Sequence, residues 1–341
     1  MASNSERKPA WVLVTIPKAY HPSLKLTEAM HEMYQVIHWE EFSSAVDQYA
    51  AKVDAMLVTP SGTPKLSPGL LDRMVNLKAV VTPSSGTDHL DLALLRKYNI
   101  KVYSAGGVNN DACADMVFNM LLSVARRNPE VIQLTHRFAA QSEALVEQTV
   151  QVLGHEVTGS TLGIVGMGGI GYEVARRAVG FKMKTLYYSR SRRPAAEEDE
   201  VKASYCSSLD ELLPHVDFLV LSLPLTEETR HIMGRHQFNK MKSNAIVINV
   251  ARGELVDHDD LTDALRSGTI AGAGLDLTEP YPLPSGHPLL TMPNVIITPH
   301  CSALTVDMGK KNDAKNNGQS FRSNPQGLSL SYMFSSVFAV T

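Results

Sequence analysis

The stretch Thr161-Leu-Gly-Ile-Val-Gly166-Met-Gly168-Gly-Ile-Gly171 decides the fold class of this chain. A short apolar run leads into three spaced glycines, and an amphipathic pattern over residues 172–179 follows them. This order is typical of a dinucleotide site, because the turn brings the amides of a helix N-terminus up to a pyrophosphate. Gly166 would make the tight turn, Gly168 would admit the phosphates, and Gly171 would let the helix pack on the strand.

The composition of the 341 residues, with 44% hydrophobic residues and a net charge of −3, is that of an ordinary globular protein. It gives no indication of a nucleic-acid partner. No run of eighteen apolar residues or secretory signal is present, so we expect no membrane association. Cys113, Cys206 and Cys301 are scattered and fit no metal spacing, which predicts a reducing, cytoplasmic location and no metal site.

Short apolar runs alternate with helical patterns, which indicates parallel sheets with crossover helices. Two series of runs predict an α/β chain with two doubly wound domains, a flavodoxin-like substrate domain over 1–125 and a Rossmann-type NAD(P) domain over 126–305. Residues 306–341 do not continue the pattern. We expect this atypical tail to be poorly ordered, chiefly from residue 309 onward. The runs are 12–16, 54–58, 77–82, 100–103, 162–165, 185–189, 218–223, 245–250, 271–276 and 295–298.

The residue at the end of the second strand of a nucleotide domain contacts the adenosine ribose of the cofactor. An NAD enzyme usually carries a carboxylate there, which accepts a hydrogen bond from the 2′-hydroxyl. In this chain Ser189 is followed by Arg190 and Arg192, with no carboxylate at the strand end. Arginines suit a 2′-phosphate because they form charge-assisted, forked hydrogen bonds. The sequence therefore favours NADPH, with NADH possible and a solvated basic turn as the alternative.

Two candidate catalytic residues follow later strands. Arg252 ends the run before Gly253, where a bidentate guanidinium could orient the carboxylate and carbonyl of a 2-keto acid. His300 ends the run that starts at Val295, and histidine is well matched to donate a proton to a ketone oxygen near neutral pH. A structural arginine and a buried core histidine are the alternatives for each taken alone.

The ordered segments Ser84–Asp91, Gly166–Gly171, Pro224–Thr226, Val250–Gly253, Gly274–Asp276 and Thr298–His300 make the chain similar to the D-2-hydroxyacid dehydrogenase family, and within it to the glyoxylate/hydroxypyruvate reductases. The resemblance implies that Arg252 holds the substrate, that His300 is the acid/base, and that Ser85 and Gly86 bind the substrate carboxylate. It also implies a homodimer and an Asp276 that binds the nicotinamide carboxamide. The expected cofactor-binding set is Gly166, Met167, Gly168, Gly169, Ile170, Gly171, Ser189, Arg190, Arg192, Pro224, Val250, Ala251 and Asp276.

The chain departs from the family pattern at the third catalytic residue. The family has Glu five positions after the residue matching Asp276, and Tyr281 stands there. Without that carboxylate the imidazolium pKa would fall, and Glu279 is the candidate replacement. Gly169 stands where the family usually has a basic residue. The stretch 139–147 also lacks the tryptophans that hydroxypyruvate reductases carry there.

The leading hypothesis is NADPH-dependent reduction of glyoxylate or hydroxypyruvate to glycolate or D-glycerate. One alternative is a reductase of a larger 2-keto acid such as 2-ketogluconate. The other is a non-catalytic NAD(P)H-sensing protein, because the family resembles the C-terminal-binding-protein corepressors.

Overall fold

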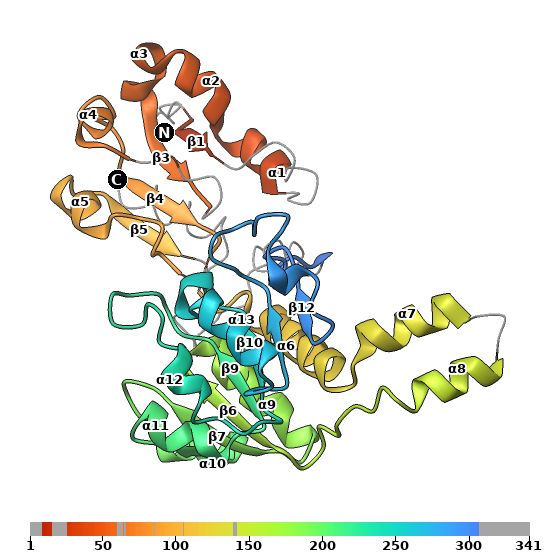
Figure 1. Cartoon of the computed structure of the whole chain (residues 1–341). Coiled ribbons are helices and arrows are strands. Elements are labelled where there is room, and N and C mark those ends of the chain that lie inside the picture. The colour runs from red at the N-terminus through yellow and green to blue at the C-terminus, as the bar shows by residue number, and fades with distance from the viewer. Residues whose placement is uncertain are drawn as a thin grey trace. The chain divides into compact units, whose positions relative to one another are not determined.

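The structure, a computed structural model, describes residues 9–15, 26–59, 64, 66–84, 86–104, 106–138 and 142–306 (Figure 1). These residues form two compact units. One comprises the described residues up to Asn109 and from Thr305, and the other spans Asn110–Leu304. The expectations for Ser85 and for the tail beyond residue 306 concern positions outside the described residues.

The first unit is built on a five-stranded parallel sheet. Its strands are β1 (Trp11–Val14), β2 (Gln35–His38), β3 (Val53–Leu57), β4 (Ala79–Thr82) and β5 (Lys101–Ser104), in the order β2-β1-β3-β4-β5. This is the doubly wound order of flavodoxin-like sheets. The helices are α1 (Leu26–Met33), α2 (Trp39–Ser44), α3 (Val46–Tyr49), the 3-10 turn η2 (Ala50–Lys52), α4 (Pro68–Leu71) and α5 (Leu92–Lys97).

The second unit is built on a seven-stranded parallel sheet in the order β12-β11-β10-β9-β6-β7-β8. The six strands from β8 to β11 follow the Rossmann order 3-2-1-4-5-6, and β12 adds a seventh beside β11. The order reverses between β6 and β9, which is where such sheets bind ligands. The strands are β6 (Thr161–Val165), β7 (Lys184–Tyr188), β8 (Ala203–Tyr205), β9 (Phe218–Leu221), β10 (Ile246–Asn249), β11 (Gly272–Leu275) and β12 (Val295–Ile297).

Helices cover both faces of this second sheet (Figure 1). α6 (Asn110–Ala125) packs on α9 (Gly169–Gly180), and both contact the strands on one face. The residues of α11 (Leu209–Leu212), α12 (Arg235–Phe238) and α13 (His258–Arg266) pack on the other face. The remaining elements are α7 (Asn128–Phe138), α8 (Ser142–Thr149), α10 (Ala195–Val201), η3 (Leu213–His215), η4 (Gly253–Leu255) and η5 (Pro288–Leu290).

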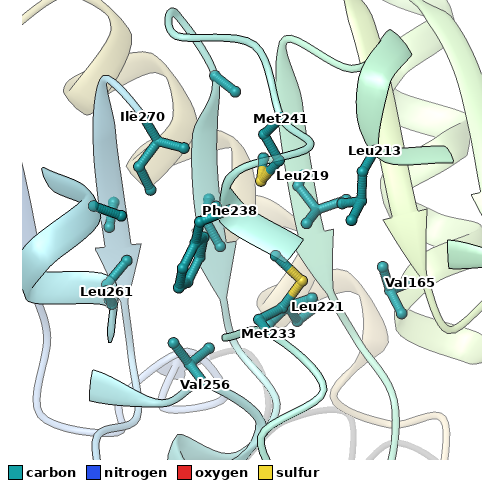
Figure 2. Close-up of a cluster of buried hydrophobic side chains, with 14 of the residues drawn as sticks. Val165, Leu213, Leu219, Leu221, Met233, Phe238, Met241, Val256, Leu261 and Ile270 are labelled. Atoms are coloured by element: carbon teal, nitrogen blue, oxygen red, sulfur yellow. The ribbon is translucent and has the colours of Figure 1, made fainter. Parts of the chain in front are cut away.

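Burial on both faces explains why the strands read as continuous apolar runs. Along β9, Leu219 and Leu221 enter the cluster that includes Phe238 and Leu261 (Figure 2), whereas the alternate residues enter the cluster under α6 and α9. All four residues of β9 are buried. Strands that are apolar on both faces need helices on both faces of their sheet. The second unit is therefore a three-layer arrangement, with the sheet between two layers of helices.

The predicted class, α/β with two doubly wound parallel sheets, is confirmed. Each of the ten predicted runs overlaps a strand, with ends within two residues where the structure describes them. The sequence analysis missed β2 and β8, which have four and three residues and no apolar run of their own. The α6 helix, assigned above to the substrate domain, belongs to the second unit by its contacts. The limits at 125 and 305 remain a prediction of the functional boundaries.

Candidate active site

The glycine turn after β6 forms an open cradle at the start of α9. Gly166 has φ +97°, and a side chain there would lie 2.7 Å from the carbonyl O of Ser222. A Cβ on Gly171 would lie 2.3 Å from the carbonyl O of Gly166, so neither glycine accepts a side chain. A Cβ on Gly168 would meet nothing within 4 Å, and Gly168 caps the helix with no side-chain hydrogen bond. The backbone can therefore be approached closely at Gly168, at the N-terminus of a helix, as binding of a pyrophosphate requires.

Asn110, the first residue of α6, lies against this turn. A Cβ on Gly169 would fall 2.2 Å from Asn110 Nδ2. The side-chain amide of Asn110 thus lies in the space beside Gly169 and would have to move to admit a larger residue at this departure from the family pattern. The sequence analysis did not identify Asn110, because its only signal is the missing side chain fifty-nine positions later.

The arginines after β7 have different partners. Arg192 Nε and Nη2 form a fork on the buried carboxylate of Glu198 at 2.8–3.2 Å, and Tyr187 OH donates to the same carboxylate at 2.6 Å. Hydrogen bonds from Arg192 and Tyr187 lower the pKa of Glu198. Arg192 therefore stabilises the turn after β7 through an internal ion pair with Glu198. A 2′-phosphate would have to compete with Glu198 for the guanidinium of Arg192.

The neighbouring Arg193, which the sequence analysis passed over, contacts the glycine turn. Its Nε donates to the carbonyl O of Met167 at 2.8 Å, and its Nη1 lies 2.6 Å from Glu197. Ser189 and Arg190 lie between β7 and these residues, and the Arg190 side chain is exposed. Arg190 also contributes to the lowered pKa of Glu228, after hydrogen bonds from Thr226 and the Glu228 backbone. Arg190 is therefore the predicted arginine that stays at the surface of the nucleotide turn.

Arg252 follows β10 in a turn that is tied internally. The buried Asn249 accepts from the amide of Ala251 at 3.0 Å and donates through Nδ2 to the carbonyl O of Arg252 at 2.7 Å. A Cβ on Gly253 would lie 2.3 Å from the carbonyl of Thr278, so the turn after β10 packs directly on the turn after β11. The guanidinium Nη1 donates to the carbonyl O of Ala251 at 2.7 Å. These contacts fix the base of the Arg252 side chain at the carboxyl edge of the sheet.

His300 follows β12 in a turn that Asp276 organises. The Asp276 carboxylate is fully buried and accepts from Thr298 Oγ1 and from the amides of Cys301 and Ser302, the amides at 2.9 Å. The amide of His300 donates to the carbonyl O of Asp276 at 2.9 Å, and His300 has φ +52°. Asp276 thus accepts hydrogen bonds from the backbone amides of His300 and of the two residues that follow it. Its expected contact with a nicotinamide carboxamide stays a prediction, beside this role in the turn.

A hollow among the described residues lies at the other edge of the second sheet. It has a volume of about 320 Å³, and its lining includes Ser160, Asp217 and Asn244, at the amino ends of β6, β9 and β10. Parallel strands place the glycine turn at the opposite edge, so this hollow is separate from the candidate site.

Within the described ranges, no cluster of three His, Cys, Asp or Glu could hold a metal ion. No helix in that part of the chain is long and apolar enough to cross a membrane.

Comparison with known proteins identifies the family. Residues 118–302 match the model of the D-isomer specific 2-hydroxyacid dehydrogenase, NAD binding domain. The chain is 40% identical over 253 residues to a glyoxylate reductase of Thermococcus gammatolerans, covering 74% of each chain. It is 39% identical over 285 residues to a glyoxylate/hydroxypyruvate reductase B of Escherichia fergusonii, covering 82% of this chain and 85% of the relative. This chain belongs to the D-2-hydroxyacid dehydrogenase family.

Solved structures agree with that assignment. The fold matches a glyoxylate reductase from Paecilomyes thermophila with a TM-score of 0.78 and 29% identity, over 97% of this chain and 96% of that one. It matches an Aquifex aeolicus D-lactate dehydrogenase, complexed with NAD and lactic acid, with a TM-score of 0.75 and 27% identity, over 90% and 93% of the chains. The predicted enzyme class, an NAD(P)-dependent 2-hydroxyacid dehydrogenase, is confirmed at this level.

The structure does not bring Glu279 to the histidine of this D-2-hydroxyacid dehydrogenase. Its carboxylate oxygens lie 3.0 Å from Arg230 Nη1 and 3.1 Å from His231 Nε2, and its amide donates to His258 Nε2 at 3.4 Å. Partial burial opposes ionisation of Glu279, but the hydrogen bonds from His231 and Arg230 outweigh it and lower the pKa. The loop after β9 thus supplies Glu279 with two partners, Arg230 and His231, and its expected replacement of the family carboxylate stays a prediction.

The remaining predicted residues lie on the segments expected of them. Pro224 lies in the loop after β9, where its carbonyl O accepts from Thr229 Oγ1 at 2.8 Å. Val250 and Ala251 are buried in the turn after β10. Gly86 belongs to the first unit, in the loop after β4, and its contact with substrate stays a prediction.

Proposed function

We propose that this chain reduces glyoxylate or hydroxypyruvate to the D-2-hydroxy acid, glycolate or D-glycerate, with hydride from NADPH. One observation carries the proposal: Gly166, Arg252 and His300 follow β6, β10 and β12, three strands of one parallel sheet. Parallel strands end at the same edge, so the cofactor turn and both candidate catalytic residues share that edge. The names of the relatives from Thermococcus gammatolerans and Escherichia fergusonii support this substrate class.

The chain's own residues would divide the work as follows. Arg252 binds the carboxylate and the carbonyl oxygen of the 2-keto acid, which fixes the face that the carbonyl carbon presents. His300 donates a proton to that oxygen as it gains negative charge. The nicotinamide, when bound, supplies the hydride. The proposed role of Ser85 and Gly86, in the sequence of the first unit, is to bind a substrate carboxylate through their amides.

The residues of the glycine cradle suit a nicotinamide dinucleotide, because Gly168 at the N-terminus of α9 leaves open space in which phosphates could approach the backbone. For the preference for NADPH over NADH we rely on Ser189 and Arg190. Arg192 contributes less than the sequence suggests, because its fork is engaged with Glu198. NADH remains the alternative cofactor.

We further propose a cytoplasmic homodimer in which a second copy covers the arm formed by α7 and α8. These helices contact each other and run away from the sheet (Figure 1), and neither contains a buried residue. Large apolar side chains on and after the arm are exposed, including Ile132, Val146 and Leu153 at 56%, 64% and 74%. A partner surface would remove this apolar area from water. Sedimentation equilibrium of the full chain tests it, and a monomer at all concentrations would contradict it.

The decisive experiment follows NADPH oxidation by the purified chain across glyoxylate, hydroxypyruvate, 2-ketogluconate and other 2-keto acids. Arg252→Ala should raise KM and lower kcat together, and His300→Ala should lower kcat about a hundredfold or more. Arg266→Ala and His155→Ala, at exposed positions on the last turn of α13 and beside the far hollow, are matched controls that should keep full activity. Highest efficiency with 2-ketogluconate would favour the larger substrate.

Tyr281 gives a reason to keep the non-catalytic alternative in the test, because it replaces the family's carboxylate. Tight NADPH binding without turnover of any 2-keto acid would support a cofactor-sensing role. Equal activity of the wild type and both site variants would contradict the proposed mechanism.

A further inference from the structure

Tyr281 contacts the imidazole of His300 from the position at which the family places a carboxylate. The ring centroids are 6.2 Å apart and the ring planes are perpendicular, the edge-to-face arrangement that aromatic pairs prefer. Tyr281 is 53% exposed, so burial of its own side chain does not explain its position.

A second contact ties Tyr281 to the backbone of the same segment. Its hydroxyl donates to the carbonyl O of Pro299 at 3.2 Å, immediately before His300. On the other side, the amide of His300 donates to the carbonyl O of Asp276, and the next two amides donate to the Asp276 carboxylate. The histidine segment is thus held from two sides. Asp276 accepts hydrogen bonds from the backbone amides of the segment. Tyr281 donates to the backbone carbonyl O of Pro299 and packs its ring against the imidazole of His300.

We propose that Tyr281 is the positioning residue of His300, holding the imidazole by ring packing where other family members use a carboxylate. The consequence for turnover rests on the proposed reductase function. A neutral phenol restricts the ring without adding negative charge, so it orients the proton donor and does not raise its proton affinity as a carboxylate would. Among the described residues, the titratable groups around the segment include Asp276, which faces the amides, Cys301, which follows the histidine, and Cys113, whose thiol donates to Ser302 Oγ at 3.7 Å. Glu279 is engaged with Arg230 and His231.

The first test uses NMR of the histidine rings in the full chain without cofactor, so it is independent of activity. The His300 signals are assigned by their loss in His300→Gln. Tyr281→Leu should shift them, because the ring current disappears, whereas Tyr281→Phe should leave them close to the wild type. Tyr98→Leu, at a half-buried tyrosine of the first unit whose hydroxyl donates to Asp72, is the matched control and should not change them.

Restoring the family residue gives the sharpest arm. Tyr281→Glu should raise the pH midpoint of the His300 titration by about one unit or more, because an opposite charge at this distance favours the imidazolium. Glu279→Gln should leave that midpoint unchanged. His300 signals that are the same in the wild type and in Tyr281→Leu, or a midpoint unmoved in Tyr281→Glu, would overturn the inference.

Kinetics then separate this inference from the proposed function. In an active wild type, Tyr281→Leu should lower kcat about tenfold to a hundredfold with KM changed little, since a misplaced donor affects the chemical step. Tyr281→Phe should restore most of kcat, and an equal loss in the two variants would refute ring positioning. An inactive wild type with the expected NMR shifts would refute the reductase function and leave the contact with His300 established.

Discussion

Replacing Asp276 with asparagine tests how firmly the turn that carries His300 is anchored. The buried carboxylate accepts three hydrogen bonds, two of them from the amides of Cys301 and Ser302. An asparagine has one acceptor oxygen, and its amide nitrogen would face an N–H donor. At least one of the three donors must therefore lose its partner.

The expected magnitude follows from that count. A hydrogen bond to a charged group contributes about 1.5–3 kcal/mol, so Asp276→Asn should lower the free energy of local opening by about 2 kcal/mol. Amide exchange in residues 298–304 should then become about thirtyfold faster. Hydrogen-exchange mass spectrometry of that segment measures the effect directly.

Two controls make the measurement specific to the turn. Asp263→Asn removes an exposed carboxylate of α13 and should leave exchange in 298–304 unchanged. Trp11 and Trp39, both in the first unit, are the only tryptophans of the chain, so their fluorescence should report unchanged unfolding of that unit. Unchanged exchange at the turn in Asp276→Asn would show that the carboxylate does not anchor it.

Three further predictions follow from the nucleotide side of the site. Gly166→Ala should weaken NADPH binding and lower the free energy of unfolding by about 1–3 kcal/mol through its positive φ and crowded Cβ, whereas Gly180→Ala, with open space around it, should be neutral or stabilising in thermal denaturation. Burial, and then a hydrogen bond to the carboxylate of Glu198, raises the pKa of Tyr187 to about 12. Because this pKa exceeds the unfolded value of 10, the stability that the protonated phenol contributes is present below pH 10 and is lost between pH 10 and 12. Tyr187→Phe should therefore remove that step from the pH dependence of unfolding. Arg190→Ala should reduce the ratio of kcat/KM for NADPH over NADH more than Arg192→Ala does, and equal losses would contradict the assignment of the surface arginine.

The sequence was sufficient for the sheets because hydrophobic runs record burial directly. Strand β9 reads as an apolar run because both of its faces are covered, and the glycines at 166 and 171 record two close backbone approaches. Strand β8 left no such record, since its three residues include an exposed Ser204. Patterns of local sequence therefore predicted the fold but missed β2 and β8, each at one edge of its sheet.

Side-chain partners were harder to predict, because they come from elsewhere in the chain. Glu279 is two residues from the family position, yet Arg230 and His231, forty-nine and forty-eight residues earlier, determine where its carboxylate lies. Arg192 looked available for a phosphate until Glu198 appeared as its partner. Residue type and spacing predict which groups reach an edge of the sheet, whereas the competition among their partners is decided by three-dimensional packing.

The strands at the two ends of the second sheet, β8 and β12, have three residues each and are its shortest. An edge strand exposes unpaired amides and carbonyls, and a long one is a template on which another chain can add a strand. Three residues provide too few backbone pairs for stable addition, so the sheet has a built-in defence against edge-to-edge aggregation. Because β12 ends at Ile297, the backbone can form the irregular turn that carries His300. A longer strand there would increase the risk of polymerisation and would draw the histidine segment into regular strand structure.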